Sequence, residues 1–244
     1  MHKALETAVE WGLLSRNIAD AVRAPRIEPK EMQTWDEDDV TQFLEAEKDD
    51  SYYALFHTAL FTAMRRSELL ALRWGDVDFI FCQVSVNRSL HQLKDGSYVF
   101  THPKSAKSRR TIALSPSAIL TLEEHRNKQE VQRSILGIPL TDDDLVFSKP
   151  DGKPLRPDTI TRAWKAMTKR ASKPICLHSA RHTHASLMLK QGVHPKIVQE
   201  RLGHATIAVT LDMYSHVAPG LQGAAAASFD KLVLPKRESD PVKK

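Results

Sequence analysis

The sequence of 244 residues predicts an α+β fold that is mainly helical, with a small three-stranded antiparallel sheet at one side. Apolar residues recur at helical spacing through most of the chain, which is typical of amphipathic helices. Residues 79–114 instead alternate apolar and polar positions, which is the period of a half-buried strand. A hydrophobic content of 41% is enough for a sizeable core. The length fits one large domain, or one domain with a fragment attached.

The N-terminal residues 1–25 form a small helical piece in this prediction. Two short helices are expected there, and Ser15 or Asn17 begins the second. Proline among charged residues follows, and residues 26–32 are predicted to be a linker. A helical piece of this size cannot bury much by itself. We therefore expect residues 1–25 to be the tail of a preceding domain.

The next helices have recognisable caps. Thr34 or Asp36 is expected to cap a helix with acidic residues 37–39 in its first turn. Residues 52–62 continue as a mostly apolar helix. Ser67 is expected to cap the helix after that, which carries several leucines.

Three strands are predicted within residues 79–114, at 84–86, 98–100 and 111–114. Asp95-Gly96 is a tight-turn dipeptide and is expected to join the first strand to the second. A polar turn at 104–108 is expected to join the second strand to the third. That turn holds lysines, so the prediction includes a cationic hairpin.

Everything after these strands is predicted to be helical, over residues 116–136, over 157–172 and from 177 onward. Pro157 at a first helical turn and Gly192 and Gly203 past helix ends fit the usual placement of these residue types. The last ten residues are charged and contain proline, which predicts a disordered tail.

The charge balance permits nucleic-acid binding without proving it. Lysine and arginine outnumber aspartate and glutamate by 35 to 30, giving +5 and a pI near 9.2. Cys82 and Cys176 are far apart, which indicates a reducing compartment and excludes a disulfide framework or a thiolate metal site. Neither a signal-peptide pattern nor an apolar run of ~18 residues is present, so a cytoplasmic protein without membrane contact is expected.

Several common sites are excluded by missing motifs. The sequence contains neither G-x-G, nor a P-loop, nor H-E-x-x-H. His178 and His182 are four apart and could share a metal, but no nearby acid or cysteine completes the set, and Arg181 would repel a dication. His182 and His184 are interpreted as structural. His178 and Arg181 share a helix face, where a guanidinium and an imidazole could together bind a phosphate.

Four motifs follow one another along the chain. They are T-x-x-R-x-x-E-L from Thr62, H-x-x-R from His178, L-G-H ending at His204, and Tyr214 ten residues later. In this order they resemble the tyrosine recombinase (phage integrase) family. The resemblance covers residues 33–220, and it implies the catalytic fold of DNA breaking-rejoining enzymes.

The resemblance also assigns the ends of the chain. Residues 1–25 resemble the last helices of the family's core-binding domain, as its C-terminal remnant. Residues 33–220 are then the catalytic domain. Residues 221–244 are expected to be a segment that docks on a neighbouring subunit, followed by the disordered tail.

The resemblance implies that the catalytic residues are Arg65, Lys104, His178, Arg181, His204 and Tyr214. Arg65, Arg181 and His204 match the cationic cradle that holds the phosphodiester. Glu68 matches an acidic neighbour that supports this cradle. The basic residues expected to contact the DNA backbone are Arg66, Lys107, Arg109 and Arg110.

The remaining matches concern proton transfer. Tyr214 matches the nucleophile, and its phenol needs a base or nearby positive charge because its ordinary pKa is about 10. Lys104 matches the general acid that protonates the leaving 5′ oxygen. His178 is a plausible acceptor of the phenol proton.

The implied function is site-specific cleavage and rejoining of DNA through a 3′-phosphotyrosyl intermediate. The phosphotyrosyl bond conserves the bond energy, so neither ATP nor a metal cofactor is expected. The implied partners are double-stranded DNA, further copies of the chain in a DNA-bound homotetramer, and accessory DNA-bending proteins. The chain by itself is predicted to be a monomer in solution.

Three departures from the family pattern leave alternatives open. Ala63 stands where the family usually has glycine, and a positive φ there would strain an alanine. Ser179 and Ala180 replace an acid and a leucine, and Ile18 replaces a proline. The alternatives are a type IB topoisomerase that relaxes DNA, and a catalytically weakened DNA-binding relic.

Overall fold

The computed structural model describes residues 1–22, 33–102, 109–171 and 173–211, and single positions at 223, 226, 229, 230 and 233. The chain divides into two compact units, residues 1–32 and 33–244. The predicted linker at 26–32 and most of the predicted docking segment and tail at 221–244 lie outside the described residues. Where the structure describes the chain, none of its helices has the length and apolarity that a membrane span requires.

The first unit consists of α1 (His2–Glu10) and the 3₁₀ helix η1 (Ile18–Ala21). Asn17 caps η1, because its side chain accepts a hydrogen bond from the Ala19 N–H at 3.0 Å. This confirms one of the two predicted helix starts. None of residues 1–22 is buried, as expected for so short a piece.

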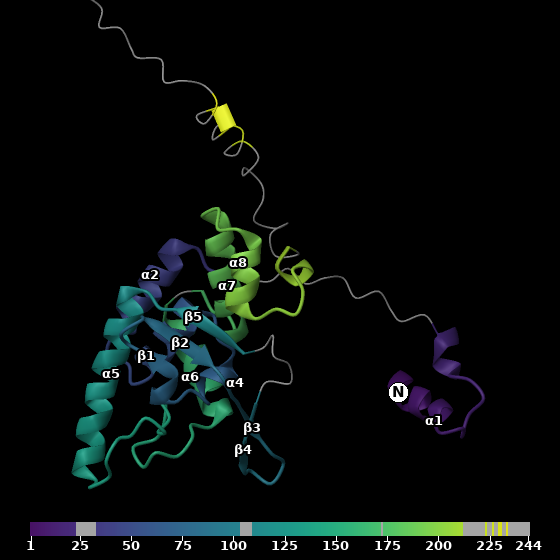
Figure 1. Ribbon diagram of the computed structural model, residues 1–244, viewed down its shortest axis with the longest axis horizontal. Helices are drawn as coiled ribbons and strands as arrows, with labels where there is room; N and C mark the ends of the chain where they lie inside the picture. The colour runs from purple at the N-terminus through teal and green to yellow at the C-terminus, as the bar shows by residue number, and fades with distance from the viewer. Residues whose placement is uncertain are drawn as a thin grey trace, which may run out of the picture. The chain divides into compact units, whose positions relative to one another are not determined.

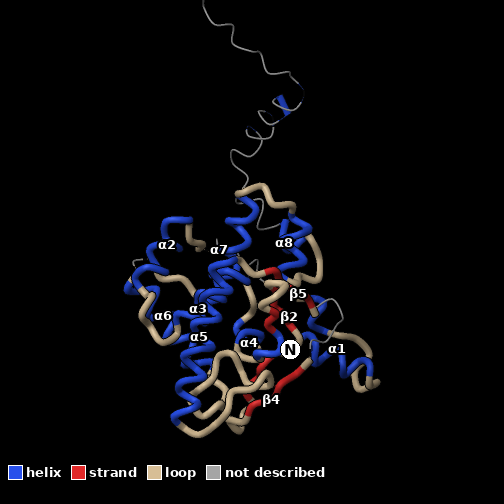
Figure 2. The backbone as a smooth tube through the Cα atoms, turned by 60° about the vertical axis from the view of Figure 1, so that its left-hand side comes forward, coloured by secondary structure: helices blue, strands red, loops and turns tan. Residues whose placement is uncertain are grey.

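The second unit is mainly helical with a small amount of antiparallel strand, which confirms the predicted fold class (Figures 1 and 2). Its helices are α2 (Glu37–Ala46), α3 (Tyr53–Thr62), α4 (Arg66–Leu69), α5 (Pro116–Ile135), α6 (Pro157–Arg170), α7 (Leu177–Lys190) and α8 (Pro195–Leu202), with the 3₁₀ turn η2 (Trp74–Asp76) after α4. Its strands are β1 (Val77–Asp78), β2 (Gln83–Val86), β3 (Ser89–Gln92), β4 (Tyr98–Thr101) and β5 (Arg110–Ala113).

The strand pairing differs from the prediction in one respect. The three-stranded sheet has the order β1-β2-β5, while β3 and β4 form a separate two-stranded sheet. The predicted pairing of strand 84–86 with strand 98–100 is therefore wrong, and the Asp95-Gly96 turn joins β3 to β4 instead. The sequence pattern missed β3 because only Leu90 of its four residues is buried, which leaves no alternation to detect. Val84 pairs with Ile112 between β2 and β5, and both side chains are buried.

The core is built around α3, which packs against both α5 and α7. An aromatic cluster closes one side of this core. The ring centroid of Trp35 lies 4.9 Å from that of Phe43, and the Trp164 ring lies 5.0 Å from Phe56. Because these four rings come from the domain's first residues and from α2, α6 and α3, their burial fixes those elements together.

The helix caps explain where two of the helices begin. Asp36 caps α2 and forms a capping box with Asp39, which confirms the second of its two predicted caps. Ser67 does not cap α4, contrary to the prediction. The helix begins after Arg65, because the Glu68 carboxylate accepts a hydrogen bond from the Arg65 N–H at 2.8 Å.

The start of the second unit is held by two hydrogen bonds. The Trp35 backbone N–H donates to Thr183 Oγ1 at 3.1 Å, and its indole N–H donates to the Lys173 carbonyl at 2.8 Å. Thr183 is buried in α7, so this bond ties the first residues of the unit to a helix that comes about 150 residues later.

We predict that Thr183→Val lowers the free energy of unfolding by about 1–3 kcal/mol, because it keeps the side-chain shape but leaves the buried Trp35 N–H without an acceptor. Thr58→Val is the matched control. Thr58 is also fully buried, but its hydroxyl donates to the Ala54 carbonyl of its own helix at 2.8 Å, and that carbonyl keeps its helical bond. Urea denaturation measures both changes, and equal losses would contradict the assignment.

Candidate active site

Several of the predicted site residues meet in one pocket beside α4, α6 and α7. The pocket has a volume of about 390 Å³, and its polar lining includes Arg65, His178 and Arg181. Arg65 lies more than 110 positions before His178 and Arg181 in the sequence. The fold has therefore brought the two predicted arginines to the same pocket.

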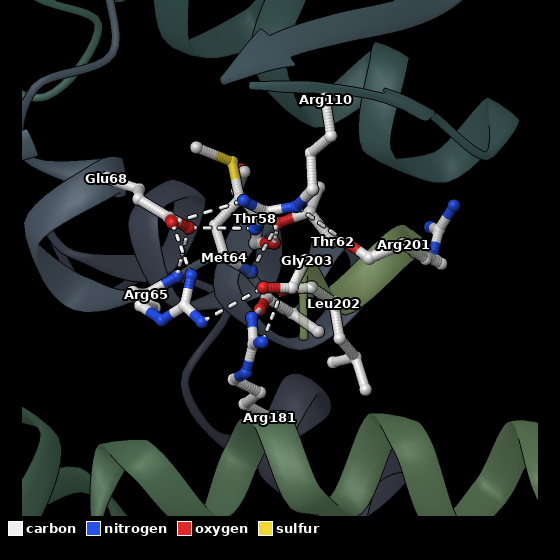
Figure 3. A network of polar contacts seen from close by, with 11 residues as sticks. Thr58, Thr62, Met64, Arg65, Glu68, Arg110, Arg181, Arg201, Leu202 and Gly203 are labelled. Carbon is white, nitrogen blue, oxygen red and sulfur yellow. Dashed lines mark hydrogen bonds and ion pairs between the residues drawn. The ribbon is translucent and has the colours of Figure 1, made fainter. Parts of the chain in front are cut away.

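Arg65 reaches this pocket because the chain turns sharply at the end of α3. Ala63 adopts the left-handed conformation, with φ 53° and ψ 26°, and it is fully buried. Arg65 then precedes α4, and its Nη1 donates to the Glu68 carboxylate at 2.8 Å (Figure 3). Its Nη2 donates to the Gly203 carbonyl at 3.3 Å. The side chain remains 41% exposed, so it is fixed in place and still open to the pocket.

Glu68 also binds a second guanidinium. Arg110 donates from Nη1 and Nη2 to the two carboxylate oxygens, at 3.1 and 2.8 Å, and from Nε to the Arg201 carbonyl at 2.8 Å. The side chains of Glu68 and Arg110 are each only 6% exposed. Arg110 is predicted to contact the DNA backbone, but this burial leaves little of its side chain exposed for such a contact. Its guanidinium is used inside the protein, where it holds Glu68.

The Glu68 carboxylate stays ionised despite its burial. Burial by itself raises the pKa of Glu68, but hydrogen bonds from Arg110, the charge of Arg110 and the contacts with Arg65 together lower it below its ordinary value. The carboxylate therefore contributes one negative charge among three neighbouring guanidiniums.

Arg181 is the third of these guanidiniums, and it is buried. Its Nη1 donates to the Ala63 carbonyl at 2.6 Å, and its Nη2 donates to the Leu202 carbonyl. Burial and the charges of Arg65 and Arg110 lower the pKa of Arg181 to about 9. The guanidinium is still protonated at neutral pH, and the carbonyls hold it without cancelling its charge.

His204 follows directly on the turn that binds these arginines. Gly203 ends α8 in the left-handed conformation, with φ 65°, as its predicted position past a helix end requires. The His204 N–H donates to the Gln199 carbonyl at 3.1 Å, and the Gln199 amide donates to the His204 carbonyl at 3.0 Å. Burial and the charges of Arg181 and Arg65 lower the pKa of His204 to about 4, so its imidazole is neutral at pH 7.

His178 lies in the first turn of α7 and is exposed at the pocket. Partial burial and the charges of Arg181 and Arg65 lower the pKa of His178, which favours a neutral ring able to accept a proton. Its ring lies 4.8 Å from that of His182. His182 is itself partly buried, and burial lowers its pKa to about 4.

His184 and Arg201 form a support behind the site. The sequence predicts a structural role for His184, whose Nδ1 lies 2.8 Å from the Leu60 carbonyl while its Nε2 accepts from Arg201 Nε at 2.9 Å. Arg201 was missed. It donates to the carbonyls of Ala113 and Phe61 at 2.9 and 2.7 Å, and so ties α8 to β5 and to the end of α3. The sequence feature that could have identified Arg201 is its position directly before the L-G-H motif.

The other predicted residues are less engaged or cannot be placed. Arg66 lines the pocket edge, where its Nη1 donates to the Pro157 carbonyl at 3.3 Å, and Arg109 is exposed. Lys104, Lys107 and Tyr214 lie outside the described residues. Within the described part of the chain, no group of three His, Cys, Asp or Glu side chains could hold a metal ion.

Ser179 and Ala180 are both buried within a continuous α7. Ala180 belongs to the main hydrophobic core, and the Ser179 hydroxyl lies 3.2 Å from Cys176 Sγ. The small residues at these two positions therefore pack inside the unit and leave the helix that carries His178 and Arg181 unbroken.

Comparison with known proteins adds an independent result. The model of the phage integrase family matches residues 33–220. The chain is 33% identical over 236 residues to the ICEBs1 integrase of Bacillus subtilis, covering 96% of this chain and 64% of that protein. It is 30% identical over 246 residues to a XerC-like tyrosine recombinase of Caldanaerobacter subterraneus, covering 93% and 63%. The chain thus spans just under two thirds of the length of these relatives.

Solved structures have a similar fold. The Tn1549 transposon integrase in complex with a circular intermediate DNA matches with a TM-score of 0.73 at 22% identity, over 95% of this chain and 76% of that one. A λ integrase tetramer bound to a Holliday junction matches with a TM-score of 0.60 at 17% identity, over 99% of this chain and 59% of that one.

We predict that Ala63→Gly leaves the stability unchanged within about 0.5 kcal/mol. Relief of the left-handed conformation gains roughly 1–2 kcal/mol, while the lost methyl group and the freer unfolded chain together cost a similar amount. Ala59→Gly is the control, because Ala59 is equally buried but lies inside α3. That change should cost about 2 kcal/mol in urea denaturation. Equal costs at the two positions would exclude strain at Ala63.

We predict that Glu68→Gln lowers the free energy of unfolding at pH 7 by about 3 kcal/mol, because it leaves buried guanidiniums uncompensated. The folded-state pKa of Glu68 is lowered, so its contribution is present above the ordinary value of 4.5 and is lost as the pH falls through the folded-state pKa. The difference between wild type and variant should therefore be constant near neutral pH and shrink below pH 4.5.

Glu45→Gln, at an exposed position of α2, is the control and should not shift the urea midpoint. A difference between wild type and Glu68→Gln that grows on acidification would contradict the ion-pair role of Glu68.

Proposed function

Because this chain belongs to the phage integrase family, we propose that it cleaves and rejoins DNA at specific sites through a 3′-phosphotyrosyl intermediate. The observation that carries the proposal is the convergence of three side chains on one turn. Arg181 and Arg65 donate to the carbonyls of Leu202 and Gly203, and His204 follows directly. Two cations and a neutral hydrogen-bond donor beside an open pocket suit a phosphodiester, whose charge increases in the pentacoordinate state.

The cradle would act by electrostatic stabilisation. Arg65 is partly exposed and can pair with a non-bridging oxygen, while Arg181 supplies charge from a buried, fixed position. A neutral His204 can donate one further hydrogen bond. Preorganised donors of this kind typically contribute roughly 3 kcal/mol each when one is removed.

Cleavage of the DNA strand exchanges one phosphoester bond for another. The Tyr214 oxygen attacks the phosphorus, the bond from phosphorus to the 5′ oxygen breaks, and Lys104 supplies the proton that this oxygen takes up. The phenol proton passes to His178, whose lowered pKa leaves it able to accept it. A second 5′-hydroxyl reverses these steps and restores the phosphodiester, so the sequence of steps uses neither ATP nor a metal ion.

The proposed partner is double-stranded DNA, with a homotetramer as the assembly that exchanges strands. The net charge of +5 and the exposed Arg109 are compatible with contact to a phosphate backbone. The λ integrase tetramer on a Holliday junction is the model for such an assembly. The segment at 221–244 is proposed to dock on a neighbouring copy.

Neither alternative function is favoured. Type IB topoisomerase activity would use the same nucleophile, but the sequence relatives are integrases and recombinases. A weakened relic would be expected to have a broken cradle, whereas here Arg65 binds Glu68 and Arg181 binds the Ala63 carbonyl.

We expect a denaturation-resistant protein–DNA adduct when the chain is incubated, with EDTA and without ATP, with a nicked suicide duplex carrying the DNA that flanks its own gene. Tyr214→Phe should form none, because phenylalanine has no attacking oxygen. Tyr98→Phe, on β4, is the matched control and should form as much adduct as wild type. Denaturing gel electrophoresis reports the adduct, and an adduct that survives in Tyr214→Phe would exclude the assigned nucleophile.

A further inference from the structure

Thr210 places a buried hydroxyl against the imidazole of His204. It lies in the helical turn at 208–211 and is fully buried, and its N–H donates to the Ile207 carbonyl at 2.9 Å. Its Oγ1 lies 3.0 Å from His204 Nδ1. Nothing in the roles assigned above uses this threonine.

Which group donates in this hydrogen bond follows from where each of the two protons can find an acceptor. Among the described residues, His204 Nδ1 is the one side-chain or ring partner found for the Thr210 hydroxyl. If Nδ1 carried the imidazole proton, it would donate to Oγ1, and the hydroxyl proton would be buried without an acceptor. If the hydroxyl donates to an unprotonated Nδ1, both groups are satisfied. The second arrangement is therefore favoured.

The consequence lies on the other ring nitrogen. A neutral imidazole carries one proton, so an unprotonated Nδ1 leaves that proton on Nε2. The ring is neutral at pH 7, because burial and the neighbouring arginines lower the pKa of His204 to about 4. No hydrogen bond to Nε2 is found within the described part of the chain, so this N–H is left for a ligand in the site.

The backbone of His204 is already fixed by Gln199 at both its N–H and its carbonyl. These backbone bonds leave the ring free to rotate about the Cβ–Cγ bond, and a 180° flip would put Cδ2 in the place of Nδ1 and Cε1 in the place of Nε2. The contact from Thr210 opposes that flip.

We infer that Thr210 is a positioning residue whose hydroxyl donates to His204 Nδ1, so that His204 presents an Nε2–H to a non-bridging oxygen of the scissile phosphate. The inference rests on the proposed function for its ligand, but the tautomer itself does not depend on activity. Thr210 also lies four residues before Tyr214 in the sequence.

The first test is spectroscopic and uses the protein without DNA. In ¹⁵N-histidine-labelled protein, the two ring nitrogens of His204, assigned by their loss in His204→Gln, should show the proton on Nε2 at pH 7. Thr210→Val keeps the shape and removes the donor, so the Nδ1 shift should move, whereas Thr210→Ser should keep it. Thr206→Val, at an exposed position of the same loop, is the matched control and should leave it unchanged. A proton on Nδ1 in wild type, or an unchanged shift in Thr210→Val, would overturn the inference.

The second test is the single-turnover rate of adduct formation on the nicked suicide duplex. Thr210→Val should be at least about tenfold slower, as expected when one transition-state donor is misplaced, while Thr210→Ser should be close to wild type. If serine is slower than valine, the side chain acts by packing and the inference is wrong. If wild type forms no adduct while the tautomer results hold, the proposed function fails and the positioning of His204 by Thr210 stands.

Discussion

The buried carboxylate of Glu68 is the constraint on which the rest of the site depends. Arg65 and Arg110 lie close enough to Arg181 to lower its pKa, and Glu68 is the anion beside these three guanidiniums (Figure 3). Arg65 and Arg110 donate hydrogen bonds to the Glu68 carboxylate, and the negative charge of Glu68 partly offsets the lowering of the Arg181 pKa. The site can therefore keep a net positive charge, because Glu68 compensates part of that charge and carbonyl dipoles hold the remaining guanidinium charge.

Backbone carbonyls supply that remaining compensation. Leu202, Gly203 and Ala63 each direct a carbonyl at an arginine of the site, and Arg201 offers its own carbonyl to Arg110. These acceptors orient the guanidiniums without adding a formal negative charge to the site. The support formed by His184 and Arg201 lies behind them and fixes the end of α8 against α3 and β5. The position of the turn that carries His204 therefore depends on contacts that lie outside the pocket.

Ala63 shows how local conformation and global packing compete. A left-handed conformation suits glycine, yet this chain uses alanine, whose methyl group is buried with Ala185, Leu189, Val198 and Leu202. The strain and the packing gain are each of the order of 1 kcal/mol, so neither dominates. The carbonyl of Ala63 accepts a hydrogen bond from Arg181 at 2.6 Å, so the left-handed turn at an alanine is compatible with this contact.

The sequence by itself determined most of the helices and the family, and it singled out the two arginines that meet at the pocket, because periodicity, caps and ordered motifs are local signals. Asn17, Asp36 and Gly203 mark the ends of helices through contacts within a few residues, so the sequence alone can indicate them. Only the tertiary structure decided the separate pairing of β3 with β4, the burial of Arg110 and the role of Arg201. A cation on a strand looks the same in sequence whether it binds DNA or an internal carboxylate. The difference is set by which distant group the fold places opposite it, here Glu68, and spacing along the chain carries no record of that.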